Sequence, residues 1–177
     1  MSKSKKMPKA EKKRAPLGSA ELRKHRAYHE AAHAVVAHLL NIPSVVNRSA
    51  EELVATISDS GGEVPIVRDQ DNPNAPRPPA EVRNIQLALC AGMAAEKVFL
   101  GRIGAAHHND RQEIDRLGQE LRKGGYLSDS RDVLIAETKA ILKNDRNKRI
   151  VEACAEVLLE DDRLTAGQLR SIADSQG

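Results

Sequence analysis

The 177-residue sequence is poor in aromatic residues and in cysteine. It has no tryptophan, one phenylalanine and two tyrosines, so Leu, Ile, Val and Ala must build most of the core, a composition that favours helices. Cys90 and Cys154 lie far apart and neither belongs to a C-x-x-C pair, so we interpret them as buried thiols. No apolar run reaches eighteen residues, and none follows the basic N-terminus. We therefore expect a cytoplasmic protein with no membrane insertion and no secretory signal.

The net charge of +3 is unevenly distributed along the chain. Residues 1–18 hold seven Lys or Arg against one Glu, a charge of +6, so the remaining residues carry −3. This segment has no hydrophobic periodicity, and we predict a disordered basic tail over 1–18 followed by one domain over 19–177. No aromatic residues are interleaved with its lysines, so it lacks a stacking platform for bases, and we do not expect nucleic acid as a partner.

Hydrophobic periodicity predicts a mainly α fold with a small β element. Apolar residues at spacings of three and four predict helices, and two short strand-like runs separated by a stretch with Gly61 and Gly62 predict a hairpin. Pro65 would confine the second strand to an edge, and a proline-rich stretch over 69–79 predicts a loop. The expected helices span residues 20–40, 81–100, 109–123, 130–143, 147–160 and 166–174, and the expected strands span 53–57 and 64–67.

The motif His29-Glu30-Ala31-Ala32-His33 lies inside the first expected helix. Residues four apart share one face of a helix, so both imidazoles can reach one metal ion, while Glu30 lies beside them to take a proton from a metal-bound water. Apolar residues follow directly, which indicates a buried or half-buried helix in which histidines need partners. The alternative is a helix with two polar residues packed near its core side.

Two carboxylates interrupt apolar helix faces further along the chain. Glu96 continues the stripe that contains Met93, and Asp110 begins a stripe that continues with Ile114, so both are expected to point inward. An inward carboxylate needs a cation or hydrogen-bond donors. Each also has a simpler interpretation. Glu96 lies near a helix end and would reach water, and Asp110 in a first turn would complement the helix dipole.

A zinc site needs a third protein ligand, and helix geometry removes one candidate. His25, His29 and His33 would span about 12 Å along one helix, too far for a single ion with bonds of about 2 Å. The third ligand must therefore come from another part of the chain. The available groups are His107, His108, Asp110 and Glu96, and spacing alone does not choose among them.

Two separated segments resemble the peptidase domain of FtsH-type ATP-dependent zinc metalloproteases. Residues 28–36, YHEAAHAVV, are similar to that family's AYHEAGHAVV segment. Residues 91–101, AGMAAEKVFLG, and 104–110, GAAHHND, look like its GGRAAEE and TGASND elements. Residues 164–169 loosely resemble an LxxxEL element near the end of the family's domain, with Gln168 in place of the Glu. The resemblance runs from about Glu21 to Asp174.

The resemblance implies a zincin-like metal helix with a small β element and a C-terminal helical bundle. It implies that His29, His33 and Asp110 bind Zn²⁺ and that Glu96 lies behind the histidines. Glu30 would act as the general base that activates a zinc-bound water. The expected function is a zinc metalloendopeptidase, a hydrolase that cleaves peptide bonds in unstructured proteins or peptides, with a polypeptide as substrate.

Departures from the family pattern leave alternatives open. His107 and His108 stand where the family has small residues, so either one could replace or assist Asp110. The sequence shows no Gly-rich phosphate loop, which is compatible with a separate ATPase or an adaptor that acts in trans. A homo-oligomer is also compatible with the sequence. One alternative function is an inactive zinc-binding relative that acts as an adaptor or regulatory protein. Another is a helical structural protein whose histidines are simply packed.

Overall fold

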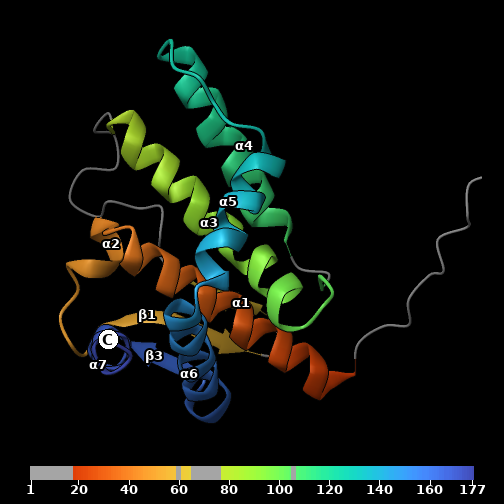
Figure 1. The fold of residues 1–177 in the computed structure, drawn as a ribbon, viewed down its shortest axis with the longest axis vertical. Coiled ribbons are helices and arrows are strands. Elements are labelled where there is room, and N and C mark those ends of the chain that lie inside the picture. The colour runs from red at the N-terminus through yellow and green to blue at the C-terminus, as the bar shows by residue number, and fades with distance from the viewer. Residues whose placement is uncertain (1–17, 59–60, 65–76, 105–106) are drawn as a thin grey trace, which may run out of the picture.

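The computed structural model describes residues 18–58, 61–64, 77–104 and 107–177. These residues form a mainly helical fold with a small antiparallel sheet, which confirms the predicted fold class (Figure 1). The helices are α1 (Ser19–Leu39), α2 (Pro43–Val46), α3 (Pro79–Phe99), α4 (His108–Lys123), α5 (Arg131–Lys143), α6 (Asp145–Asp161) and α7 (Ala166–Ser175). The strands are β1 (Leu53–Ser58), β2 (Gly61–Glu63) and β3 (Arg163–Thr165), in the order β2-β1-β3. Among the described helices, none combines the length and apolar character needed to cross a membrane.

Small side chains bring α1 and α3 close together. The two helices pack against each other, and both are rich in alanines that have no solvent exposure. Figure 1 shows α1 running across the middle of the molecule, with α3 on one side and the sheet on the other. A Cβ added to Gly92 of α3 would lie only 2.3 Å from Cε1 of His29. The backbone of α3 therefore passes directly against the ring of a predicted metal ligand.

The second strand begins earlier than the sequence predicted. It spans Gly61–Glu63, and Gly61 and Gly62 pair with Ser58 and Ile57 where the sequence predicted the turn. Of the predicted strand over 64–67, only Val64 lies within the described residues, and it is not part of β2. The physical reason is space, because a Cβ on Gly62 would lie 2.4 Å from Cγ of Glu30 on α1. Glycine thus lets the strand lie directly over the side chain of Glu30. The residues at 65–76, with Pro65 and most of the expected loop, and the tail over 1–17 lie outside the described residues.

The third strand and the short helix α2 were not predicted. β3 contains only three residues, too few for a periodic signal, and it pairs antiparallel with β1 so that Leu53 lies opposite Thr165. Thr165 also caps α7, because its side chain accepts a hydrogen bond from Gln168 N at 3.2 Å while Gln168 Oε1 accepts one from Thr165 N at 2.8 Å. This reciprocal cap fixes the point where the chain leaves the sheet.

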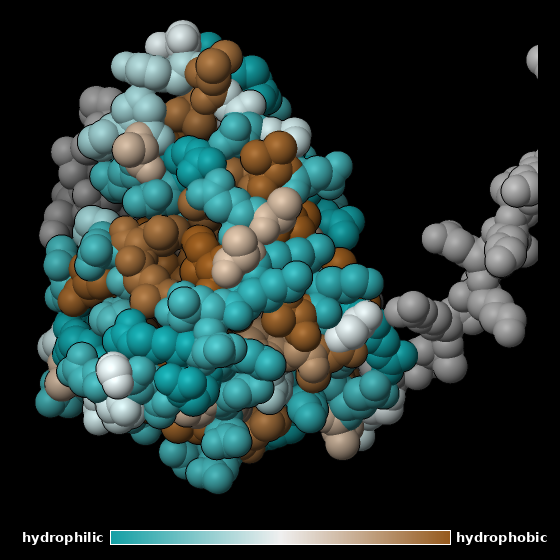
Figure 2. All heavy atoms as spheres, in the orientation of Figure 1, coloured by the Kyte–Doolittle hydropathy of each residue, from teal (hydrophilic) through white to brown (hydrophobic). Residues whose placement is uncertain are grey.

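The remaining helices pack around α1 and α3. α5 packs against α3, α6 packs against α1, and α7 follows α6. α4 turns its buried residues Ile114, Leu117 and Leu121 inward, and Gln86 of α3 donates a hydrogen bond to the carbonyl of Ile114 at 3.0 Å. These contacts determine where the first turn of α4 lies. At the far end of α4 the chain carries exposed hydrophobic residues, with Leu127 fully exposed, and Figure 2 shows hydrophobic atoms at that end of the molecule.

Candidate metal centre

Two helices bring three of the predicted site residues together. α1 supplies His29 and His33 on one face, and the first turn of α4 supplies Asp110. The ligand atoms of the three residues all lie within 4.8 Å of one another, so they could hold one metal ion. The two histidines are buried and Asp110 is half-buried. Two histidines and one carboxylate are a set of side chains typical of catalytic zinc sites, in which three protein ligands leave the fourth position to water.

The distances among these atoms match the spacing of zinc ligands. The Nε2 atoms of His29 and His33 lie 2.9 Å apart. Asp110 Oδ2 lies 3.1 Å from His29 Nε2 and 3.6 Å from His33 Nε2. Tetrahedral zinc with bonds of about 2.0–2.1 Å separates neighbouring ligand atoms by about 3.3 Å. An ion therefore fits among the three side chains with shifts of a few tenths of an ångström.

The hydrogen bonds of both rings leave their Nε2 lone pairs facing this point. His33 Nδ1 lies 2.6 Å from the carbonyl oxygen of Ala88, which only accepts, so this nitrogen carries a proton. His29 Nδ1 lies 2.9 Å from Oε1 of the ionised Glu96, so it also donates. Each neutral ring then has an unprotonated Nε2, and both face the carboxylate of Asp110. Three lone-pair donors around one point require a cation between them, either a metal ion or a proton.

Without a metal the proton takes this place. Burial by itself lowers the pKa of His29, but the hydrogen bonds with Asp110 and Glu96 outweigh burial and raise this pKa to about 10. Burial raises the pKa of Asp110, yet His33 and His29 together hold it well below its usual range. The Asp110 carboxylate is therefore ionised, and the protonated His29 ring places a positive charge next to it.

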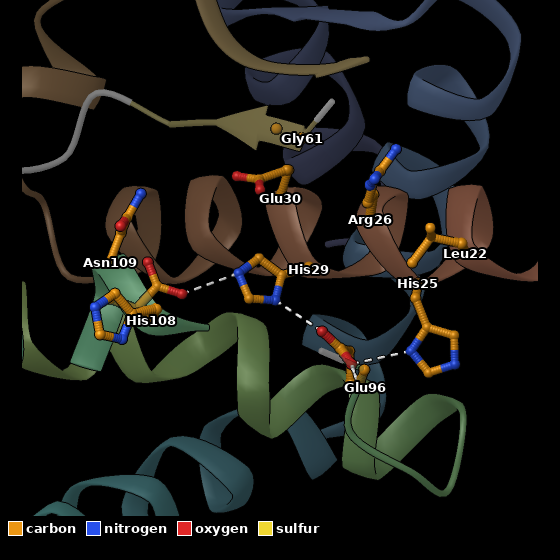
Figure 3. A pocket seen from close by; sticks show the side chains of 12 residues that line it. Leu22, His25, Arg26, His29, Glu30, Gly61, Glu96, His108 and Asn109 are labelled. Atoms are coloured by element: carbon orange, nitrogen blue, oxygen red, sulfur yellow. Dashed lines mark hydrogen bonds and ion pairs between the residues drawn. The ribbon is translucent and has the colours of Figure 1, made fainter. Parts of the chain in front are cut away.

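Glu96 lies behind the histidines and contacts more of them than the sequence suggested. It is only 2% exposed, and Oε2 accepts hydrogen bonds from His25 Nδ1 at 2.9 Å and from Gly104 N (Figure 3). Its other oxygen, Oε1, accepts from His29. Burial raises the pKa of Glu96, but His107, His29, the Gly104 N–H and His25 hold it well below its usual range. A carboxylate bonded to a ligand histidine fixes its tautomer and orientation.

Sequence reasoning gave His25 no role beyond being too far away to share the ion. The structure agrees that it is not in the ligand group, but it bonds Glu96 and so supports His29 indirectly. The sequence feature that could have indicated this role is the position of His25, one turn before His29 on the same helix face. Gly62 and Gly92, which make room for Glu30 and His29, were also missed, because the need for a missing side chain appears only once the partner elements are packed.

His107 and His108 occupy different environments. His107 is 4% exposed and stacks on His29, with ring centroids 4.9 Å apart and an angle of 23° between the rings. Its Nε2 lies 3.2 Å from Glu96 Oε1 but outside hydrogen-bonding geometry. His29, Glu96 and His107 form a second group close enough for a metal, yet lone pairs in the planes of two nearly parallel rings converge poorly on one ion. His108 is exposed and lines the adjoining pocket.

Glu30 lies between the histidines and the hairpin. Its side chain is 7% exposed and packs under Gly62 of β2. Burial raises the pKa of the Glu30 carboxyl above its usual value, while His33 and His29 partly offset this effect. A raised carboxyl pKa suits a group that must accept a proton and release it again near neutral pH.

Two pockets, of about 320 and 420 Å³, adjoin the site. The first extends along α1 towards Leu22, and the second extends towards Leu89 and Val64. Figure 3 shows the first pocket, with Gly61 on the far side of Glu30 from His29. The two pockets share the residues Glu30, Gly62, Asn109 and Asp110. A chain lying through both pockets would pass beside the expected base and the expected carboxylate ligand.

Comparison with curated proteins finds partial homology to zinc metalloproteases. The chain is 34% identical over 95 residues to ATP-dependent zinc metalloprotease FtsH 2 of Sphaerobacter thermophilus, covering 54% of this chain and 14% of that protein. It is 30% identical over 121 residues to ATP-dependent zinc metalloprotease FtsH 1 of Sorangium cellulosum, covering 64% and 19%. The chain thus spans less than a fifth of the length of these relatives. No family model matches the chain. The chain is therefore similar, over part of its length, to a small part of two proteins named as zinc metalloproteases.

Proposed function

We propose that this protein is a zinc metalloendopeptidase that hydrolyses peptide bonds in unstructured polypeptides. The observation that carries the proposal is the convergence of His29 Nε2, His33 Nε2 and Asp110 Oδ2 at 2.9–3.6 Å beside the buried carboxylate of Glu30. The partial homology to proteins named as zinc metalloproteases supports it. His29, His33 and Asp110 would hold Zn²⁺, which when bound lowers the pKa of a water and polarises a carbonyl.

Glu30 would move the proton. Its carboxylate takes a proton from the attacking water as the new C–O bond forms, and then donates it to the amine nitrogen as the C–N bond breaks. Gly62 covers the side chain and limits its contact with bulk water. Glu96 would hold the His29 ring by accepting a hydrogen bond from its Nδ1–H at 2.9 Å, so that Nε2 faces the ion.

The edge strand β2 would hold the substrate. It pairs with β1 on one side, and no described strand pairs with its other side. Its residues line both pockets, so an extended polypeptide can add to this edge through main-chain hydrogen bonds while its side chains enter the pockets. Only an unfolded segment can pair in this way. A separate ATPase or adaptor acting in trans would therefore deliver folded substrates.

The test compares hydrolysis of denatured casein by zinc-matched wild type and Glu30→Gln, without ATP. Cleavage by the wild type alone supports the proposal, and the exposed change Glu160→Gln on α6 serves as the matched control. If neither protein cleaves casein but both hold one zinc per chain, the peptidase proposal fails. The inactive zinc-binding adaptor then becomes the better interpretation.

A further inference from the structure

We propose that His108 is a further catalytic residue, whose ring N–H donates a hydrogen bond to the substrate carbonyl oxygen as negative charge develops on it. The inference rests on the proposed peptidase function and goes beyond the ligands and the base. His108 begins α4, two residues before Asp110. It lines the first pocket together with Asp110 and Glu30 (Figure 3). The imidazole thus borders the space in which a peptide bond would lie.

The charges around the pocket create a need for such a donor. Glu30 and Asp110 line it beside the reacting groups, and a third carboxylate, Glu96, lies behind His29. When water attacks a carbonyl carbon, the π electron pair moves onto the carbonyl oxygen and a further negative charge forms there. A donor already in place for that oxygen lowers the barrier, because it need not reorganise during the reaction.

The other side chains of this pocket that carry a ring or guanidinium N–H are already engaged. Nη1 of Arg26 donates to the carbonyl oxygen of Ser58 at 2.7 Å, and Figure 3 shows this side chain pointing away from His29. His25 donates to Glu96 at 2.9 Å. His29 is one of the three proposed metal ligands. For His108 the structure shows no hydrogen bond or ion pair to any residue in the described ranges, and its side chain is exposed on the pocket wall.

The neighbouring His107 cannot take this role. It is 4% exposed and stacks on the ring of His29, so it is enclosed behind the proposed metal ligands. His108 follows it at the start of α4 and lies on the open side. His107 therefore packs against His29, whereas His108 faces the pocket in which the substrate would lie. In the reaction His108 only donates a hydrogen bond, while Glu30 carries the transferred proton from the water to the leaving amine.

The test uses zinc-loaded full-length protein carrying His108→Ala or His108→Gln, with Lys123→Ala at the exposed far end of α4 as the matched control. Loss of a donor to a developing oxyanion should lower kcat by about 100-fold or more with little change in KM. Glutamine keeps an N–H donor and should restore part of the rate. A phosphonamidate peptide, which mimics the tetrahedral geometry, should bind His108→Ala about 100-fold more weakly by calorimetry, while a cleaved product peptide binds as before.

Zinc content separates this role from that of a ligand. The His108→Ala protein should retain one zinc per chain by elemental analysis. Loss of zinc would show that His108 is a ligand and overturn the inference. Wild-type kcat and phosphonamidate affinity in His108→Ala would overturn it as well, while leaving the peptidase function intact. If the wild type shows no cleavage that depends on Glu30, the proposed function fails and this assignment fails with it.

Discussion

The Nε2 atoms of His29 and His33 lie 2.9 Å apart. The Nδ1–H group of each ring donates a hydrogen bond to an acceptor on α3. The acceptors are a carboxylate of Glu96 and the carbonyl of Ala88, and both are buried. The acceptors on α3 therefore determine which nitrogen of each histidine carries the proton and which is free to bind a cation. Two free nitrogens and one carboxylate then surround a single point, where either a metal ion or a proton supplies the positive charge.

Replacing Asp110 by Asn should remove most of the zinc affinity. The change takes a negative charge from the ligand group while keeping nearly the same shape. The loss should exceed the roughly 10- to 100-fold typical of removing a partner behind a ligand. Competition with a chromogenic chelator measures it. Asp115→Asn, which removes only the exposed partner of Arg131, is the control and should bind zinc normally. Full zinc affinity in Asp110→Asn would point to a histidine as the third ligand.

Zinc binding should release at least one proton per chain between pH 7 and 8. The raised pKa of His29, about 10, means that the metal-free ring holds a proton on Nε2 in this range. The ion must displace that proton. Calorimetric titrations in buffers of different ionisation enthalpy measure the number released. A value near zero at pH 7.5 would mean that the His29 ring is already neutral before the metal arrives.

The stability of the metal-free protein should fall as the pH rises from about 6.5 towards 10. The folded-state pKa of His29 lies above the usual histidine value of 6.5, so the proton favours the folded state. This contribution is fully present below pH 6.5 and is lost as the pH rises through about 10. With zinc bound, Nε2 carries no proton and this loss should disappear. Urea unfolding of both forms at pH 6.5 and 9.5 compares the two slopes.

Gly62→Ala should reduce peptidase activity while leaving zinc bound. The new Cβ would lie 2.4 Å from Cγ of Glu30, so the expected base must move, whereas the ligands are on the other side of that side chain. Gly61→Ala on the same strand is a matched control, because nothing lies within 4 Å of its Cβ. We expect at least a tenfold loss of kcat/KM for the first change and little for the second. Equal rates in both variants would show that Glu30 tolerates displacement.

Glu96→Gln should destabilise the protein and weaken zinc binding together. An amide cannot supply the ionised acceptor that the His25 and His29 rings and the Gly104 N–H contact. Breaking one side of a buried charged network typically costs about 3–5 kcal/mol. The exposed pair of Glu113 and Arg116 offers a control, and Glu113→Gln should cost less than about 1 kcal/mol. Denaturant unfolding without metal gives both values, and equal values would contradict the network.

Much of the helical framework could be predicted from the sequence because apolar spacing encodes it locally. The predicted helix over 20–40 corresponds to α1 at Ser19–Leu39, and the inward position of Glu96 followed from its stripe on α3. β3 and the start of β2 could not be predicted in this way. A strand of three residues has no period of its own, and it exists because β1 offers it a partner.

The choice of the third metal ligand depends on packing rather than on spacing. The sequence left His107, His108, Asp110 and Glu96 as candidates. The structure distributes them according to how α4 lies on α3, and the buried face of α4 and the bond from Gln86 to Ile114 determine that arrangement. Asp110 then lies with the two α1 histidines, while His107 stacks behind them. A local pattern could identify the four groups but not their final neighbours.

The pairing of Leu53 with Thr165 has a consequence for the newly made chain. The ribosome releases α1, with its two histidines and Glu30, long before it releases β3. Until the later segment emerges, β1 and β2 form a hairpin without the strand that completes their sheet. A two-stranded hairpin is at best marginally stable by itself. The residues proposed for metal binding and catalysis on α1 are therefore synthesised well before β3, the strand that completes the sheet beside them.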